Sequence, residues 1–134
     1  MPREARRGTS PCVLFPLIGV RLHGWLDDLV SLVYVLGLYV LGASGAPLAI
    51  GCAGAFVHFA LTRCTRYPQG TWGLVSFRTH AFVELAEGAL VLVGALLFVP
   101  ASEPLVRAFL AVMGSLQFGA FALSDYRWPA ASAA

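Results

Sequence analysis

The sequence has no lysine at all and little charge of either sign. Nine arginines and seven acidic residues make up only 12% of the 134 residues, whereas soluble domains carry about 25% charged residues. The formal net charge of +2 is too small for a nucleic-acid-binding protein, so we expect no nucleic-acid partner. Hydrophobic residues reach 58%, and the mean hydropathy is +0.76. The lipid bilayer is therefore the expected surrounding of this chain.

Paired cysteines and the common catalytic motifs are also missing. Cys12, Cys52 and Cys64 stand singly, which excludes a disulfide framework and a zinc ribbon. The chain contains no H-E-x-x-H, G-x-S-x-G or phosphate-binding P-loop pattern. These absences favour a non-enzymatic protein, and we expect no cofactor.

Four apolar stretches dominate what is present, at 22–41, 47–64, 80–99 and 104–124. Each is close to the roughly 20 residues that a transmembrane helix needs. None alternates with the period of two that is typical of a transmembrane β-barrel. Because backbone groups in lipid must be satisfied internally, helices remain. The sequence predicts an all-α membrane protein with four transmembrane helices.

The two halves of the chain align without a gap at an offset of 57 residues. The matched pairs are Arg21 with Arg78, His23 with His80, Asp27 with Glu84, Gly37 with Gly94, and Pro47 with Pro104. Each copy holds two stretches joined by a short connection, which predicts an antiparallel hairpin. Since two spans are an even number, the copies form a parallel internal repeat. We expect two tandem helical hairpins, 21–64 and 80–124.

The remaining segments and the arginines predict an orientation. We expect a cytoplasmic or interfacial N-terminal segment at 1–20, a cytoplasmic linker at 65–79 and a C-terminal tail at 125–134. Eight arginines lie at one end of the predicted spans and only Arg107 near the other. The eight are Arg3, Arg6, Arg7, Arg21, Arg63, Arg66, Arg78 and Arg127. Because positive charge marks the cytoplasmic side, both termini should be cytoplasmic, in an inner membrane.

Small residues inside the stretches predict close helix packing. The candidate positions are Gly37, Gly51, Gly54, Gly94 and Gly114. Small side chains let helices approach one another in lipid. The packing they serve is either the internal bundle or contact with a second copy or another membrane protein.

Histidines and carboxylates recur at the predicted cytoplasmic end of the spans. His23 and Asp27, like His80 and Glu84, are four residues apart and share a helix face. Glu87 extends the second stripe by one turn. His58 lies about six residues before the cytoplasmic end of its span, at a similar depth. The sequence therefore predicts a cluster of His23, Asp27, His58, His80, Glu84 and Glu87, with Ser115 and Gln117 as the nearest polar residues of 104–124.

Several roles fit such a cluster. Ionisable groups within membrane spans are costly and usually functional. The interpretation we favour is structural, with the His–acid pairs clamping the two hairpins together in a packing or interaction module. A proton or divalent-cation site of a small transporter or channel is the first alternative. Metal binding, or haem ligation by two of the three histidines, in a redox protein is the second.

The duplicated Arg-x-His-x-x-x-acid pattern resembles the SPW-repeat family of small bacterial integral membrane proteins. Arg21-Leu22-His23-Gly24-Trp25-Leu26-Asp27 is similar to the opening of that family's repeat, and Thr79-His80-Ala81-Phe82-Val83-Glu84 to a second opening. The resemblance covers residues 21–124. The Ser-Pro-Trp tripeptide itself is not retained, because Gly37-Leu38-Tyr39 and Gly94-Ala95-Leu96 stand at its positions. The resemblance implies a four-helix membrane fold and carries no established activity.

Overall fold

The computed structural model describes residues 17–126, which form four α-helices. They are α1 (Val20–Val40), α2 (Gly45–Cys64), α3 (Phe77–Phe98) and α4 (Pro104–Leu123). Their ends lie within three residues of those predicted from the apolar stretches. Most of the predicted N-terminal segment and C-terminal tail, with Arg3, Arg6, Arg7 and Arg127, lies outside the described residues.

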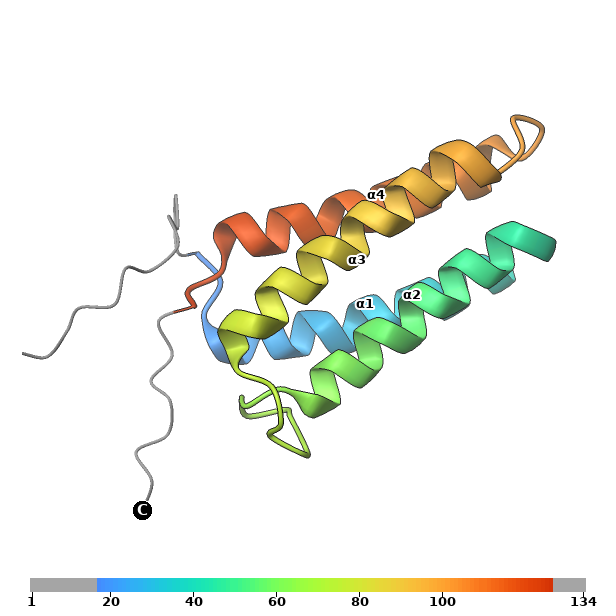
Figure 1. Cartoon of the computed structure of the whole chain (residues 1–134). Coiled ribbons are helices and arrows are strands. Elements are labelled where there is room, and N and C mark those ends of the chain that lie inside the picture. The colour runs from blue at the N-terminus through green and yellow to red at the C-terminus, as the bar shows by residue number, and fades with distance from the viewer. Residues whose placement is uncertain (1–16, 127–134) are drawn as a thin grey trace, which may run out of the picture.

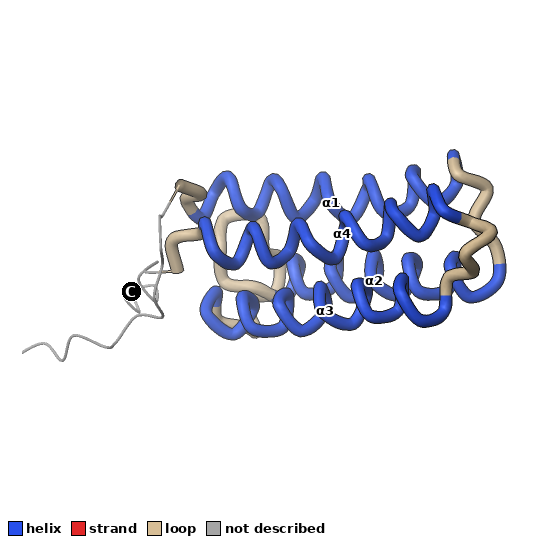
Figure 2. Tube along the Cα trace, turned by 90° about the horizontal axis from the view of Figure 1, so that it is seen from above, coloured by secondary structure: helices blue, strands red, loops and turns tan. Residues whose placement is uncertain are grey.

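The helices run up and down as an antiparallel bundle (Figures 1 and 2). Contacts between backbones are extensive for α1 with α2, α2 with α3 and α3 with α4, and sparser for α1 with α4. Short loops join α1 to α2 and α3 to α4 at one end (Figure 2). The longer connection 65–76 lies at the opposite end, beside the start of α1 and the end of α4 (Figure 1). We call this the linker end of the bundle.

Local sequence accounts for where the helices begin. Ser76 caps α3, because its side chain accepts a hydrogen bond from the Thr79 backbone N–H. Pro104 begins α4, at a position where a missing N–H has no cost. Gly42 and Gly45 adopt positive φ angles of 63° and 58° in the tight turn between α1 and α2.

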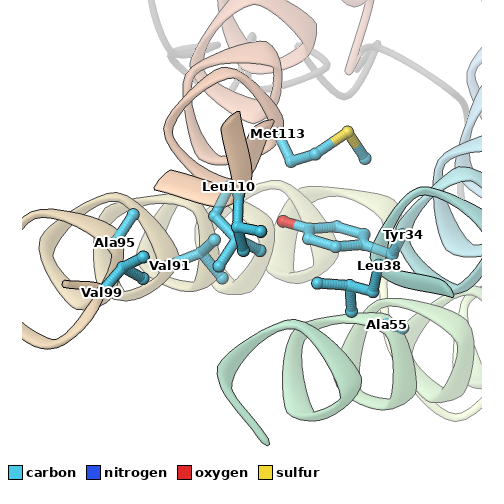
Figure 3. Close-up of a cluster of buried hydrophobic side chains, with 9 residues drawn as sticks. Tyr34, Leu38, Ala55, Val91, Ala95, Val99, Leu110 and Met113 are labelled. Atoms are coloured by element: carbon cyan, nitrogen blue, oxygen red, sulfur yellow. The ribbon is translucent and has the colours of Figure 1, made fainter. Parts of the chain in front are cut away.

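The half of the bundle away from the linker end is packed by apolar side chains. Tyr34 and Leu38 of α1 meet Val91 and Ala95 of α3 and Leu110 of α4 (Figure 3). All five are at most 4% exposed. The core therefore draws on both hairpins rather than on each hairpin alone.

The five predicted glycines all lie where another helix approaches. Gly37 faces the Phe109 ring of α4, and Gly51 faces Leu38 of α1. Gly54 and Gly94 lie against side chains across the α2–α3 contact, from Val91 and Ile50 respectively. A Cβ atom on Gly114 would lie 2.7 Å from the Gly88 carbonyl oxygen, so α3 and α4 touch through their backbones. Gly88 was not among the predicted positions.

The outer surface is apolar along its length. Large hydrophobic side chains on every helix point outwards, among them Leu32, Phe56, Leu90, Leu97 and Leu116. Soluble monomers rarely expose contiguous apolar surface of this extent. Three helices, α2, α3 and α4, are long and apolar enough to cross a membrane. These findings are consistent with a membrane protein.

Candidate functional site

Two histidines and two carboxylates converge between α1 and α3, near the linker end. We call them the quartet: His23, Asp27, His80 and Glu84. One ligand atom from each lies within 4.8 Å of the other three. The Nε2 atoms of His23 and His80 are 3.4 Å apart. Asp27 lies 3.4 Å from both, through Oδ1 to His23 and Oδ2 to His80. Glu84 Oε2 lies 3.5 Å from His23 Nε2 and 4.0 Å from His80 Nε2.

Helix geometry explains why these four side chains meet. Each His–acid pair has a spacing of four residues, which places both side chains on one helix face. α1 and α3 lie across the bundle from each other without direct backbone contact. Their polar faces therefore point into the space that the four helices enclose.

A hydroxyl group contacts the Nδ1 nitrogen of each histidine in the quartet. Ser124, directly after α4, lies 2.7 Å from His23 Nδ1. Thr65, directly after α2, lies 2.7 Å from His80 Nδ1. Each imidazole is thus anchored by the residue that ends the last helix of the other hairpin. Short backbone pairings fix the two anchors, since Ser124 pairs with Ile18 and Thr65 with Val75.

The hydrogen-bond pattern assigns the tautomer of His80. The single Thr65 hydroxyl hydrogen is donated to the Leu61 carbonyl oxygen at 2.7 Å. The hydroxyl oxygen must therefore accept a hydrogen bond from Nδ1–H of His80. In the neutral imidazole, Nε2 then carries a lone pair and no hydrogen, and this lone pair faces the quartet.

A second polar pair extends the site along the bundle. His58 Nδ1 lies 3.2 Å from Glu87 Oε2, and His58 Nε2 lies 3.6 Å from Asp27 Oδ1. The Gln117 amide donates to Glu87 Oε1 at 3.2 Å and to the Tyr34 hydroxyl at 3.3 Å. We call the quartet together with His58 and Glu87 the polar cluster. All six predicted residues therefore lie in one place.

The polar cluster is closed off from the surroundings. Its six residues are 0–6% exposed. Towards the linker end it is covered by an aromatic cap of Tyr67, Phe77 and Tyr126, whose rings pack against one another. The Tyr67 hydroxyl donates to Asp27 Oδ2 at 2.6 Å. Burial, and next the Asp27 carboxylate, raise the pKa of this hydroxyl, which keeps it protonated as a donor.

Two buried atoms that face this cluster have no hydrogen-bond partner: Nε2 of His58 and Oε2 of Glu84. Buried polar atoms are nearly always satisfied, so each exception calls for an explanation. Neighbouring polar residues behave differently. Asp28, next to Asp27, turns away from the cluster and pairs with Arg63. Ser115 is exposed and bonds to the Ala111 carbonyl of its own helix.

Sequence reasoning missed the residues that orient the quartet. Thr65, Tyr67 and Ser124 lie in connections, where no helical period indicates which way a side chain points. The one available signal is chemical, because a buried imidazole needs a partner for its second nitrogen. The polar residues just beyond each helix end are the ones placed to supply it.

The packing also bears on the haem alternative. The Phe77 ring centroid lies 5.0 Å from that of His23, and the Tyr67 ring centroid 5.6 Å from that of His80. The Nε2 atoms of His23 and His80 are only 3.4 Å apart. The Phe77 and Tyr67 rings occupy the space beside both imidazoles that a porphyrin would need. The geometry therefore favours a small ligand over a macrocycle.

Comparison with known protein families, with curated proteins and with solved structures finds no match.

Proposed function

We propose that this chain is a non-enzymatic, four-span protein of the bacterial cytoplasmic membrane whose polar cluster binds a cation and joins two helical hairpins. The observation that carries this proposal is the burial of three imidazoles and three carboxylates at one place in an otherwise apolar bundle. Ionisable groups in such surroundings are expensive unless they are paired with charge.

The fourth span in this proposal is α1, which is not among the three helices that are apolar enough overall to cross a membrane. Its charged and imidazole side chains, Arg21, His23, Asp27 and Asp28, all lie in the first three turns. His23 and Asp27 face inwards at 1–2% exposure, and Asp28 pairs with Arg63. Its outward side carries Leu29, Leu32 and Leu36, all exposed. A helix of 21 residues with an apolar outer face is long enough to cross the hydrocarbon core.

The proposed internal repeat is supported by the matching roles of residues that are 57 positions apart. His23 and His80 each lie on the first turn of a helix, pair with a carboxylate four residues on, and contact a hydroxyl at Nδ1. The resemblance to SPW-repeat proteins, which rests on the same residues, supports the same architecture. We therefore propose duplication of one hairpin as the origin of the cluster.

Arginine placement supports cytoplasmic termini. In the described part of the chain, Arg21, Arg63, Arg66 and Arg78 lie at the linker end, and Arg107 lies near the opposite end. The linker end therefore faces the cytoplasm by the positive-inside rule.

The burial of the cluster supports retention of the cation over its conduction. Its members are almost fully buried, and Tyr67, Phe77 and Tyr126 cover its linker end. A conduction path would need polar surface leading onward through the apolar half of the bundle, where Tyr34, Leu38, Val91 and Leu110 pack instead. We therefore favour a retained cation that stabilises the bundle.

Cysteine accessibility tests the topology. With Cys12, Cys52 and Cys64 replaced by serine or alanine, single cysteines are introduced as Ser44→Cys and Thr71→Cys. The proposal expects Ser44→Cys to react with a membrane-impermeant thiol reagent from the periplasmic side, and Thr71→Cys only after the cells are opened. If both cysteines react only after the cells are opened, α1 and α2 do not cross as a hairpin. If Thr71→Cys alone reacts in intact cells, the hairpins cross in the opposite orientation.

A stability panel tests the cation. The detergent-purified protein is treated with a chelator and then heated with sodium, magnesium, calcium, manganese, cobalt or zinc chloride. A cation present at about 100 times its Kd stabilises the fold by about 2.7 kcal/mol. We expect at least one cation to raise the melting temperature, and the Asp27→Asn variant to lose this response. Equal melting temperatures across the panel would contradict cation binding.

A further inference from the structure

We propose that the quartet of His23, Asp27, His80 and Glu84 is a four-ligand, tetrahedral site for a divalent transition-metal ion of the zinc class. This inference rests on the proposed cation-binding function and specifies the ion. It is carried by the geometry of the four ligand atoms, by the direction of the His80 lone pair and by the donor types.

The three separations between His23 Nε2 and the other ligands match the edges of a tetrahedron. Zinc binds imidazole nitrogen and carboxylate oxygen at about 2.0–2.1 Å, so the ligand atoms of a tetrahedral site lie about 3.3–3.4 Å apart. His23 Nε2 lies 3.4 Å from His80 Nε2, 3.4 Å from Asp27 Oδ1 and 3.5 Å from Glu84 Oε2. The Asp27 and Glu84 ligand atoms lie within 4.8 Å of each other, and the His80–Glu84 separation is 4.0 Å. It closes by rotation of the Glu84 carboxylate, whose terminal torsion is soft.

The Nε2 atom of His80 offers a lone pair to the quartet. Thr65 holds Nδ1–H of His80, which leaves Nε2 as a bare acceptor. That acceptor faces Asp27 Oδ2 and His23 Nε2, each at 3.4 Å. Glu84 Oε2 also points into this space, is buried and has no hydrogen-bond partner. Electron-rich atoms at these distances repel unless a proton or a metal ion lies between them, and a single metal ion would contact all four ligands at once.

The surroundings of the quartet are those of a metal site. Metal-bound histidines usually have the second ring nitrogen held by a hydrogen bond, which fixes the direction of the first. Ser124 and Thr65 contact the Nδ1 atoms of His23 and His80. Tyr67 holds the third ligand, because its hydroxyl donates to Asp27 Oδ2. Such partners are needed when ligands must keep their positions between two helices.

The donor set and its charge select the class of ion. Magnesium and calcium prefer sites made only of oxygen, whereas imidazole with carboxylate suits zinc and its divalent neighbours. Asp27 and Glu84, when ionised, supply two negative charges, which a divalent ion neutralises. His58 lies beside Glu87 and balances the third carboxylate when it carries a proton. The loaded cluster then buries no net charge in the bilayer.

Cobalt substitution tests the inference. The chelator-treated protein in detergent is titrated with Co²⁺ and followed by visible absorption, and Zn²⁺ is then added in competition. We expect one Co²⁺ per chain, the intense visible bands of tetrahedral Co²⁺, and loss of these bands on addition of Zn²⁺. The weak bands of octahedral Co²⁺ would overturn the four-ligand geometry.

Ligand variants with a matched control locate the ion. His23→Gln and His80→Gln should each abolish the tetrahedral bands. Asp28→Asn removes a carboxylate that neighbours Asp27 but pairs with Arg63 outside the cluster, and it should keep them. Loss of the bands in Asp28→Asn, with retention in His23→Gln, would overturn the assignment. Circular dichroism and elution volume establish that each variant is folded.

Variants of the supporting hydroxyls leave all four ligands in place. Thr65→Ala and Ser124→Ala should each weaken Co²⁺ binding about 10- to 100-fold. Ser31→Ala removes a buried hydroxyl that bonds only to the Asp27 backbone carbonyl in the described structure, and it should leave the affinity unchanged. An affinity that is unchanged in both Thr65→Ala and Ser124→Ala would overturn the proposed orientation of the imidazoles.

The outcome also separates this inference from the function on which it rests. Stabilisation by sodium, magnesium or calcium, without tetrahedral Co²⁺ bands, overturns the transition-metal site and leaves cation binding standing. No stabilisation by any cation overturns both.

Discussion

Replacement of Asp27 by leucine should strongly destabilise the protein even when no metal is bound. Asp27 accepts a 2.6 Å hydrogen bond from Tyr67 and lies 3.4–3.6 Å from Nε2 of three histidines. It is the only carboxylate that touches all three imidazoles in the described part of the chain. Removing one partner of a buried charged network typically costs about 3–5 kcal/mol. We therefore expect Asp27→Leu to lower the free energy of unfolding by about that amount.

The neighbouring acid provides the control. Asp28 differs from Asp27 by one position, but its side chain is 32% exposed and pairs with Arg63 outside the cluster. Partly exposed ion pairs contribute about 0–1 kcal/mol, so Asp28→Leu should have a small effect. Both variants are unfolded reversibly in mixed micelles by increasing sodium dodecyl sulfate, with a chelator present, and followed by circular dichroism. Equal losses of stability in the two variants would refute a structural role for the cluster.

Two further predictions concern glycines, with Gly119→Ala as their common control because a Cβ atom there meets nothing within 4 Å. Gly88→Ala should lower the free energy of unfolding by about 1–3 kcal/mol, since its Cβ would lie 2.8 Å from the Gly114 carbonyl oxygen and force α3 and α4 apart. Gly73→Ala should cost about 1–2 kcal/mol, because Gly73 has a φ angle of 59° in the linker that carries Thr65 and Tyr67. Both are measured by the same micelle titration. Gly119→Ala should be neutral or stabilising by about 0.5–1 kcal/mol, and a loss there as large as in the other two variants would contradict the packing argument.

The helices could be predicted from the sequence because their cause is local. An apolar run of about 20 residues has few alternatives to a helix in lipid. Proline at Pro104 and glycine at Gly42 then mark where helices begin and end. The weakest helix on this criterion is α1. Inward-facing His23 and Asp27, together with Arg21 and Asp28 at the same end, lower the mean hydropathy of a segment that is otherwise apolar on its outer face. An average over a window does not distinguish the two faces of a helix.

The candidate site could be predicted only as a list of residues. The four-residue spacings indicate that His23 with Asp27, and His80 with Glu84, share a face. The central position of Asp27, between all three histidines, depends on how far α1 and α3 stand apart. That separation is set by backbone contacts such as the one between Gly88 and Gly114, which no spacing within one helix reveals.

The quartet is complete only when the two hairpins are packed together. Each hairpin supplies one histidine and one carboxylate to the quartet, and the last helix of each hairpin leads directly into the hydroxyl residue that holds the other hairpin's histidine. Neither half therefore contains a complete set of ligands or a complete set of supports. α1 and α3 have no direct backbone contact, so the cluster between them is a main link across that diagonal of the bundle. A cation bound there would stabilise the docked hairpins and not the separated ones, which makes its binding energy a contribution to assembly.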